Sequence, residues 1–287
     1  MADGRIVAFD DVGDSADPVV VYLHGTPDSR LARHPDDAVT VAAGVRLIAL
    51  DRPGAGDSDL DPAGTLQSLG DDIGALLDHL GVERAILLGW SAGALFGLGA
   101  ASVLGDRVRG IGLVGAVPPV EAYADPAVVS SLGPARRAFV EMAADATPTE
   151  LAAELVPYLV PDPLTPGSAR EHVHESVGDI GRHELDAVPG AEASLVAALQ
   201  ASVAQGTRGL ALDVAAQLQP GVDLAAVRAP VRTFHGTLDP VSPPEVGAWL
   251  VARLPDAVLD RVPGGGHHLL FPRWRGILRS LLRDAVG

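Results

Sequence analysis

Short, mostly apolar runs alternate along the chain with segments of helical periodicity. Residues 65–80 place leucine or isoleucine at every third or fourth position, which predicts a helix that ends at Gly81. Residues 5–9 are expected to form an antiparallel edge strand. Four further runs are typical of strands buried on both faces of a sheet: 18–23, 45–50, 84–90 and 108–114. This alternation predicts an α/β fold with a mostly parallel sheet and right-handed crossovers.

Between residues 118 and 221 the pattern changes to helical segments separated by prolines. Helices are expected in five stretches: 135–144, 149–160, 168–180, 191–205 and 207–219. Strand and helix patterns then alternate again, with strands at 231–235 and 257–262 and helices at 243–254 and 272–285. A block of helices between two strands of one sheet predicts a lid over the carboxyl edge of that sheet. We therefore expect a core domain of residues 1–117 and 222–287, interrupted by a helical lid of residues 118–221.

Composition excludes several classes of partner and chemistry. With 287 residues, of which 47% are hydrophobic, the chain is long enough for one large α/β domain with an insertion. The formal net charge of −16 disfavours nucleic acids and anionic membranes, because both require a basic surface. The absence of cysteine excludes disulfides, cysteine-based zinc sites and a thiol nucleophile.

Two segments bear on the compartment. Residues 1–6 contain neither a basic region nor an apolar stretch, so they do not resemble a signal peptide, and we expect a cytoplasmic protein. Residues 85–105 are uncharged and long enough to span a bilayer. Charged residues lie close to both ends of this stretch, at positions 83, 84, 106 and 107. A buried strand, a tight turn and a buried helix are therefore the preferred interpretation.

The most informative short segment is Gly89-Trp90-Ser91-Ala92-Gly93, which follows an apolar run and precedes a helical pattern. A strand, a very tight turn and a helix are expected, with Ser91 at the apex of the turn. Such a turn holds the serine in a strained conformation, so its neighbours must be small. A serine hydroxyl is a poor nucleophile until a base removes its proton. Ser91 is therefore the candidate nucleophile, and it requires a base and an acid from elsewhere in the chain.

Reactive groups of a parallel sheet lie in the loops at the carboxyl ends of its strands. Asp239 and His267 each follow a strand-like run, His267 in a loop with three glycines. The chain order Ser91, Asp239, His267 is the order of nucleophile, acid and base in one known fold. His267 would accept the Ser91 proton, and Asp239 would orient the imidazole. His268 competes with His267, and Asp213 competes with Asp239 although it belongs to a helical stretch.

An acyl-transfer intermediate carries an oxyanion that requires two preorganised N–H donors. The N–H of Ala92, at the start of the helix after Ser91, is one candidate. The other is the N–H of Thr26, in the segment HGTP that follows the first buried run. Pro27 cannot donate, and His24 is expected to hold this loop rather than to act as a base.

No cofactor or metal ion is expected. Residues 51–59 follow a strand-like run and contain a Gly-x-Gly pair, but Asp59 stands where a dinucleotide-binding loop has its third glycine. His172 and His174 are two residues apart, which puts them on different faces of a helix. No carboxylate–histidine cluster in the sequence has the spacing of a metal site. We expect both histidines on the surface of the lid.

Five motifs together resemble the α/β-hydrolase family over essentially the whole chain: HGTPDSR at 24–30, DRPGAGDSD at 51–59, GWSAG at 89–93, HGTLDPVSP at 235–243 and GGGHHLLF at 264–271. The resemblance implies a mostly parallel, eight-stranded sheet with helices on both faces. It also implies a helical lid inserted after the sixth strand, which would be residues 108–114. The family's Ser–His–acid triad and its two oxyanion donors would correspond to Ser91, His267 and Asp239 and to the amides of Thr26 and Ala92.

The predicted function is hydrolysis of a small ester-like acyl bond, in a carboxylic ester, lactone or thioester, through an acyl-enzyme on Ser91. The expected partner is a small acyl substrate. Family members that dehalogenate or open epoxides carry an aspartate where this chain has Ser91, which disfavours both reactions. The same triad also serves C–C bond hydrolases, amidases, aminopeptidases and cofactor-free perhydrolases, and a receptor can bind its ligand there with little turnover. The pocket under the lid decides among these, and the sequence does not reveal it.

Overall fold

A seven-stranded sheet runs through the part of the chain that the structure, a computed structural model, describes: residues 1, 3–61, 64–143, 146–219 and 221–285. Its strands are β1 (Phe9–Val12), β2 (Val19–Leu23), β3 (Arg46–Leu50), β4 (Ala85–Trp90), β5 (Val108–Val114), β6 (Val231–Gly236) and β7 (Ala257–Val262). They lie in the order β1-β3-β2-β4-β5-β6-β7. Only the pair β1 and β3 is antiparallel in this described sheet. The predicted mostly parallel sheet is confirmed.

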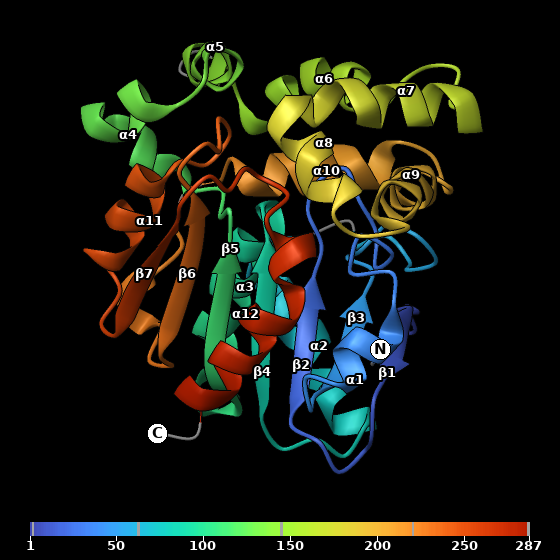
Figure 1. The fold of residues 1–287 in the computed structure, drawn as a ribbon, viewed down its shortest axis with the longest axis vertical. Helices are drawn as coiled ribbons and strands as arrows, with labels where there is room; N and C mark the ends of the chain where they lie inside the picture. The colour runs from blue at the N-terminus through green and yellow to red at the C-terminus, as the bar shows by residue number, and fades with distance from the viewer. Residues whose placement is uncertain (2, 62–63, 144–145, 220, 286–287) are drawn as a thin grey trace.

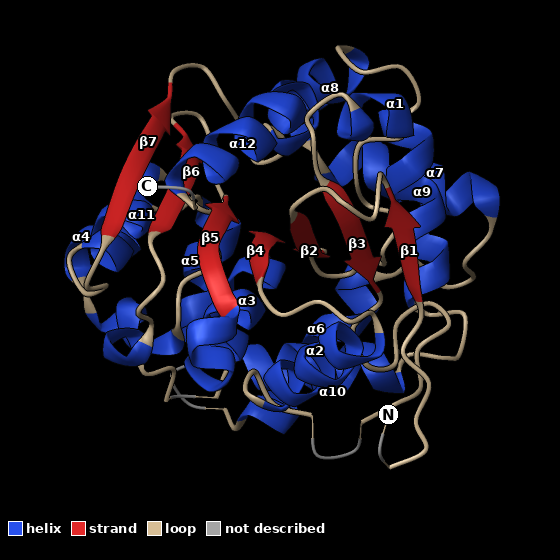
Figure 2. Cartoon of the chain, turned by 90° about the horizontal axis from the view of Figure 1, so that it is seen from below, coloured by secondary structure: helices blue, strands red, loops and turns tan. Residues whose placement is uncertain are grey.

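Helices cover both faces of the sheet, as Figure 1 and Figure 2 show. One face carries α1 (Asp37–Val41) and α12 (Leu270–Asp284), and the other carries α2 (Ser68–His79), α3 (Ala92–Leu104) and α11 (Pro244–Val251). Alternate strand residues supply the two cores: Val20 packs on the α12 side and Val21 on the α3 side. Every residue of β2 and β4 is buried, which explains why both appear in the sequence as uninterrupted apolar runs.

The amino-terminal edge of the sheet differs from the expectation. The edge strand expected at residues 5–9 is β1, which begins only at Phe9. Before it, the backbone bonds to the loop after β3: the N–H of Asp59 donates to the carbonyl oxygen of Ile6 at 2.9 Å, and the N–H of Ala8 donates to a serine hydroxyl of that loop at 2.9 Å. These contacts tie the segment before β1 to the loop after β3. The described sheet has seven strands where the family resemblance implied eight.

A helical insertion, defined here as helices α4 to α10, lies between β5 and β6 in the chain. Its members are α4 (Pro126–Ser131), α5 (Pro134–Ala143), α6 (Pro148–Leu159), α7 (Pro166–Ser176), α8 (Gly178–Asp186), α9 (Ala191–Ser202) and α10 (Arg208–Gln217). Figure 1 shows these helices across the carboxyl ends of the parallel strands. The insertion follows the fifth described strand rather than the sixth, because the amino-terminal edge has one strand fewer than expected. The division into core and lid domains stays a prediction.

One helix of the insertion is broken where the sequence predicts continuity. The stretch 168–180 is expected as a single helix, but α7 ends at Ser176 and α8 begins at Gly178. Gly178 has a φ of +63°, a value that glycine adopts without strain, and it redirects the chain. The break turns α8 toward α9 and α12, which it contacts.

The apolar stretch of residues 85–105 divides into β4, a turn and α3, in agreement with the interpretation based on its charged flanks. Three short 3-10 helices complete the regular structure of the described chain: Gly105–Arg107, Val120–Ala124 and Leu224–Ala226. Within the described ranges, every helix is too short or too polar to cross a membrane.

Candidate active site

A tight turn between β4 and α3 carries Ser91. Its backbone has φ 55° and ψ −121°, and among the described residues it is the one non-glycine with a positive φ. Small neighbours make this turn possible: a Cβ atom added at Gly89 would lie 2.4 Å from the carbonyl oxygen of Gly93, and one added at Gly93 would lie 2.1 Å from that of Leu23. The predicted strand, turn and helix are present, with the serine at the apex.

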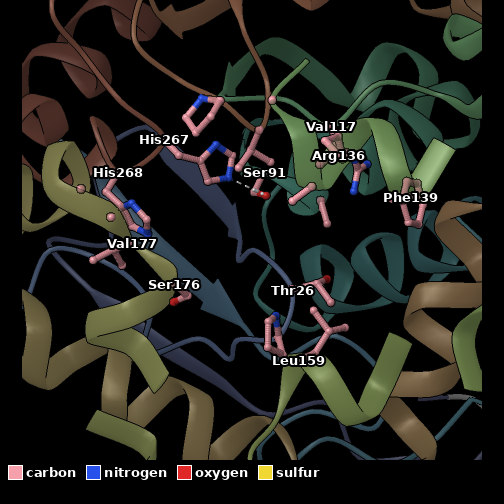
Figure 3. A pocket seen from close by; sticks show the side chains of 18 of the residues that line it. Thr26, Ser91, Val117, Arg136, Phe139, Leu159, Ser176, Val177, His267 and His268 are labelled. Atoms are coloured by element: carbon pink, nitrogen blue, oxygen red, sulfur yellow. Dashed lines mark hydrogen bonds between the residues drawn. The ribbon is translucent and has the colours of Figure 1, made fainter. Parts of the chain in front are cut away.

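The structure brings Ser91, His267 and Asp239 into hydrogen-bond contact. Nε2 of His267 lies 3.0 Å from Oγ of Ser91, and Nδ1 lies 2.8 Å from Oδ2 of Asp239. Figure 3 shows His267 directed toward Ser91. Asp239 stands in the turn after β6, and His267 in the loop between β7 and α12. The second oxygen of Asp239 accepts the N–H groups of Val241 and Ser242, at 2.8 and 2.9 Å. These two bonds fix the carboxylate in the orientation that meets the imidazole.

Burial and charge act in opposite directions on this pair. Burial of Asp239, whose exposed fraction is 3%, disfavours its charged form, but the neighbouring imidazole and the hydrogen bonds outweigh that effect and lower its pKa. Burial likewise disfavours the imidazolium form of His267. The charge and hydrogen bond of the Asp239 carboxylate outweigh this effect of burial, so the pKa of His267 is raised above the ordinary 6.5. The pair is therefore suited to general-base chemistry near neutral pH.

Neither competing residue takes part in this contact. The ring of His268 packs edge-on against Trp90, with the ring centroids 5.5 Å apart, and its Nδ1 has no hydrogen-bond partner in the described part of the chain. Burial lowers the pKa of His268 to about 3, which keeps it neutral. Asp213 lies on α10 and binds Arg52 and Thr26 rather than a histidine.

A buried ion pair holds the loop after β2, a role that the sequence reasoning missed. Arg52 donates from Nε to Asp213 at 2.7 Å, and from its other nitrogens to the carbonyl oxygens of His24 and Gly25. Arg52 also donates to the hydroxyl of Thr26 at 2.8 Å, and that hydroxyl donates to Asp213 at 2.7 Å. The available signal is an arginine directly after a buried strand, together with an acidic residue inside a largely apolar helix.

Both expected oxyanion donors belong to residues that line the cavity in front of Ser91. Ala92 is the first residue of α3, and the first N–H groups of a helix lack acceptors within the helix. Thr26 lies in the loop that Arg52 holds. His24 is buried within this loop, where its Nδ1 bonds to a backbone carbonyl oxygen at 2.7 Å and its Nε2 accepts the N–H of Arg52 at 3.2 Å. These contacts of His24 agree with the prediction that it holds the loop rather than acting as a base.

Asp28 is a second site residue that the sequence reasoning missed. It lines the cavity, and its Oδ2 would be 2.9 Å from a Cβ atom added at Gly25, which in turn would be 3.4 Å from Cβ of Ser91. Burial raises the pKa of Asp28 to about 7. The signal was present in the motif at residues 24–30, where an acidic residue occupies a loop after a strand.

A cavity of about 680 Å³ separates the sheet edge from the helical insertion. In Figure 3, Ser91, His267 and Thr26 border it together with Phe139 and Leu159 of the insertion. Its lining is mostly apolar, and its titratable or charged members are Asp28, Arg136, His172, Asp179, His267 and His268. His172 lines the cavity and is half-buried, whereas His174 is exposed, as expected. Within the described ranges, no group of three or more potential ligands could hold a metal ion.

Comparison with known proteins agrees with this fold. A sequence model of the alpha/beta hydrolase fold matches residues 18–273. The chain belongs to the α/β-hydrolase family. This α/β hydrolase is 30% identical over 260 residues to the pimeloyl-[acyl-carrier protein] methyl ester esterase of Aromatoleum aromaticum. The matched region covers 87% of this chain and 91% of that protein.

Two further similarities differ in extent. The crystal structure of the esterase RhEst1 from Rhodococcus sp. ECU1013 superposes with a TM-score of 0.64 at 25% identity, covering 98% of this chain and 96% of that one. The dihydrolipoyllysine-residue acetyltransferase component of the acetoin cleaving system of Pseudomonas putida is 34% identical over 115 residues, 39% of this chain. This α/β hydrolase matches only 30% of the length of that protein.

Proposed function

We propose that this α/β hydrolase cleaves a small ester-like acyl bond, in a carboxylic ester, lactone or thioester, through an acyl-enzyme on Ser91. The observation that carries the proposal is the hydrogen-bonded series of Ser91, His267 and Asp239, with contacts of 3.0 and 2.8 Å beside the cavity. An imidazole oriented by a buried carboxylate activates a serine hydroxyl for acyl transfer. The name of the similar Aromatoleum esterase supports an ester-type bond.

The proposed reaction has two steps, and neither requires a cofactor. In the first, Oγ of Ser91 attacks the acyl carbon while its proton passes to Nε2 of His267. The N–H groups of Thr26 and Ala92 stabilise the oxyanion, and the imidazolium returns its proton to the leaving oxygen or sulfur. In the second step, His267 deprotonates a water molecule that attacks the acyl carbon, and the imidazolium then returns this proton to Oγ of Ser91 as the bond to the acyl group breaks and the acid is released.

The cavity supports a small acyl substrate. Its volume of about 680 Å³ lies within the range of small-molecule sites, roughly 300–1,000 Å³. Apolar side chains from the insertion, including Phe139, Leu155 and Leu159, form much of its wall. Such a wall favours an acyl chain of methylene groups, because burying them stabilises the complex by about 0.8 kcal/mol per CH₂.

The test combines covalent labelling with turnover. We expect a fluorophosphonate probe to add once, at Ser91, and p-nitrophenyl butyrate to be hydrolysed. Ser91→Ala should remove the adduct and lower kcat by about 10³-fold or more, because the three residues act as a unit. Ser176→Ala is the matched control: Ser176 also lines the cavity, but its hydroxyl donates to the carbonyl oxygen of Val173. Full activity of Ser91→Ala, or labelling at another serine, would contradict the proposal.

A further inference from the structure

Arg136 faces the cavity, and the proposed acyl-transfer steps do not use it. It belongs to α5, and of the residues that the structure describes it is the one arginine in the cavity lining. Figure 3 shows its guanidinium at the border of the same cavity as Ser91 and Val117. Its positive charge is close enough to His267 to oppose protonation of the imidazole. A fixed charge at this position acts on whatever occupies the cavity.

The guanidinium is held in place without being neutralised. Its central carbon lies 4.3 Å from the ring centroid of Phe139 and 5.7 Å from that of Tyr123. Nη2 donates to the hydroxyl of Tyr123 at 2.5 Å, while Nε is buried without a hydrogen-bond partner among the described residues. Arg30 and Arg52, by contrast, are each paired with carboxylates. Nε is enclosed by the protein and is out of reach of a ligand, but no hydrogen bond of Nη1 to another described residue is found, so a ligand in the cavity that brings an acceptor can bond to this part of the guanidinium.

Tyr123 adds a second donor at the same place. Its hydroxyl accepts from Arg136, so its own proton remains free, and no described residue accepts it. Tyr123 also lines the cavity. Two donors side by side, one of them charged, match the two oxygens of a carboxylate.

The other charged side chains of the cavity do not neutralise Arg136, so its positive charge can balance one negative charge on a ligand. Asp179 is already paired with Arg182, and Asp28 has a pKa near 7, raised by burial, so it is largely uncharged below that pH. One unpaired cation balances one negative charge, which favours a carboxylate over a doubly charged phosphate.

We propose that Arg136 and Tyr123 bind a carboxylate at the far end of the acyl chain, so that the substrates are monoesters or monothioesters of dicarboxylic acids. This inference rests on the proposed function, since it names the substrate class of the same site. Apolar side chains of the cavity lining, such as Val117, are available to contact the methylene chain. A charge contact on the acyl part persists in the acyl-enzyme, whereas a contact on the leaving group ends with the first step. The acyl part is therefore where the arginine contributes to both steps.

The test compares two esters of equal chain length, mono-p-nitrophenyl adipate and p-nitrophenyl hexanoate. We expect the native enzyme to prefer the anionic ester. At a pH on the plateau of the rate profile, where loss of the Arg136 charge does not change the protonation of His267, Arg136→Met should lower kcat/KM for that ester by roughly 10- to 100-fold and leave the hexanoate within about threefold. Arg136→Lys should recover part of the loss, because it keeps the charge but not the planar fork. Arg137→Met is the matched control, because the neighbouring arginine donates to the carbonyl oxygen of Leu132 and does not line the cavity.

Two outcomes overturn the inference: a native enzyme that does not prefer the anionic ester, or an Arg136→Met variant that weakens both esters equally. If the native enzyme hydrolyses neither ester, the proposed function is contradicted. Calorimetric titration with adipate then tests by itself whether Arg136 binds a carboxylate. Binding by the native protein and by Arg137→Met, lost in Arg136→Met, would support the carboxylate site, and absence of native binding would overturn it. If circular dichroism shows that Arg136→Met is unfolded, Arg136→Lys and Tyr123→Phe carry the same comparison.

Discussion

Two ionisable side chains beside Ser91 have pKa values that the fold raises. Asp239 raises the pKa of His267 above 6.5 against the effect of burial, and burial raises the pKa of Asp28 to about 7. In the proposed mechanism only neutral His267 can accept the Ser91 proton. Asp28 has no hydrogen bond to either residue in the described structure, so its titration affects the site only through its charge.

We expect kcat/KM to rise with pH to a plateau, with a midpoint above 6.5, because the imidazolium that forms below the raised pKa of His267 cannot act as a base. Asp239→Asn should lower kcat by about 10⁴-fold, as removal of the orienting carboxylate does in a Ser–His–Asp triad. Rate profiles between about pH 5 and 9 provide the measurement. Asp28→Asn is the control, and its kcat/KM should still rise with pH. If kcat/KM of Asp28→Asn no longer depends on pH, the ionisation that controls the rate belongs to Asp28 and not to His267.

At the level of elements, α8 of the insertion supports the loop that carries His267. Glu184, which is buried, accepts the N–H of Gly266 at 2.7 Å with one oxygen and the N–H of His268 at 3.0 Å with the other. The residues on both sides of His267 are therefore bound to one carboxylate. Glu184 does not line the cavity, but its charge raises the pKa of His267. It is a positioning residue for the candidate base.

Glu184→Gln keeps the size of the side chain but replaces one acceptor by a donor, so one of the two loop bonds is lost. We expect kcat to fall roughly tenfold with a smaller change in KM, because the imidazole is less well oriented. The midpoint of the pH profile should also move down, since a nearby negative charge is removed. Glu192→Gln is the control, because Glu192 contacts only the exposed Arg170, at 3.6 Å, among the described residues. A lower melting temperature with an unchanged kcat and midpoint would contradict the positioning role.

Across the whole molecule, one buried ion pair connects three segments that are distant in the chain. Arg52 follows β3, Asp213 lies on α10 of the insertion, and both bind Thr26 in the loop after β2. The side chains of Arg52 and Asp213 are only 2% and 11% exposed. Removing one member of a buried pair leaves the other charge without compensation. Breaking the pair between Arg52 and Asp213 is therefore expected to destabilise both the sheet edge and the insertion.

Asp213→Asn should lower the free energy of unfolding by about 3 kcal/mol, the lower end of the cost of breaking a buried pair. It should also lower kcat, because the loop that supplies the Thr26 N–H loses its support. Urea unfolding and ester turnover measure the two effects. Asp260→Asn is the matched control: its partner Arg232 is also an arginine, at 3.0 Å, but Asp260 is 43% exposed, so the expected loss is at most about 1 kcal/mol. Equal losses in the two variants would contradict the coupling.

The local sequence pattern was sufficient to predict the strands that are buried on both faces. β2 and β4 have no polar face, so they stand out as apolar runs, and the tight turn at Ser91 is visible because only small residues fit around it. The edge strand was misplaced, because its start depends on contacts with another segment, such as the bond between Ile6 and Asp59, which periodicity does not contain. The break between α7 and α8 was missed, because the helical periodicity continues through Gly178, whose φ of +63° redirects the chain.

The sequence by itself determined the α/β class, the insertion of helices between strands, and the candidate residues Ser91, Asp239 and His267. It could do so because each of the three follows a strand-like run, and parallel strands end at one edge of the sheet. Only the tertiary structure decided what surrounds them. The sequence shows that Arg136, Asp28 and Asp213 are charged, but their roles depend on which segments the fold brings together around the cavity.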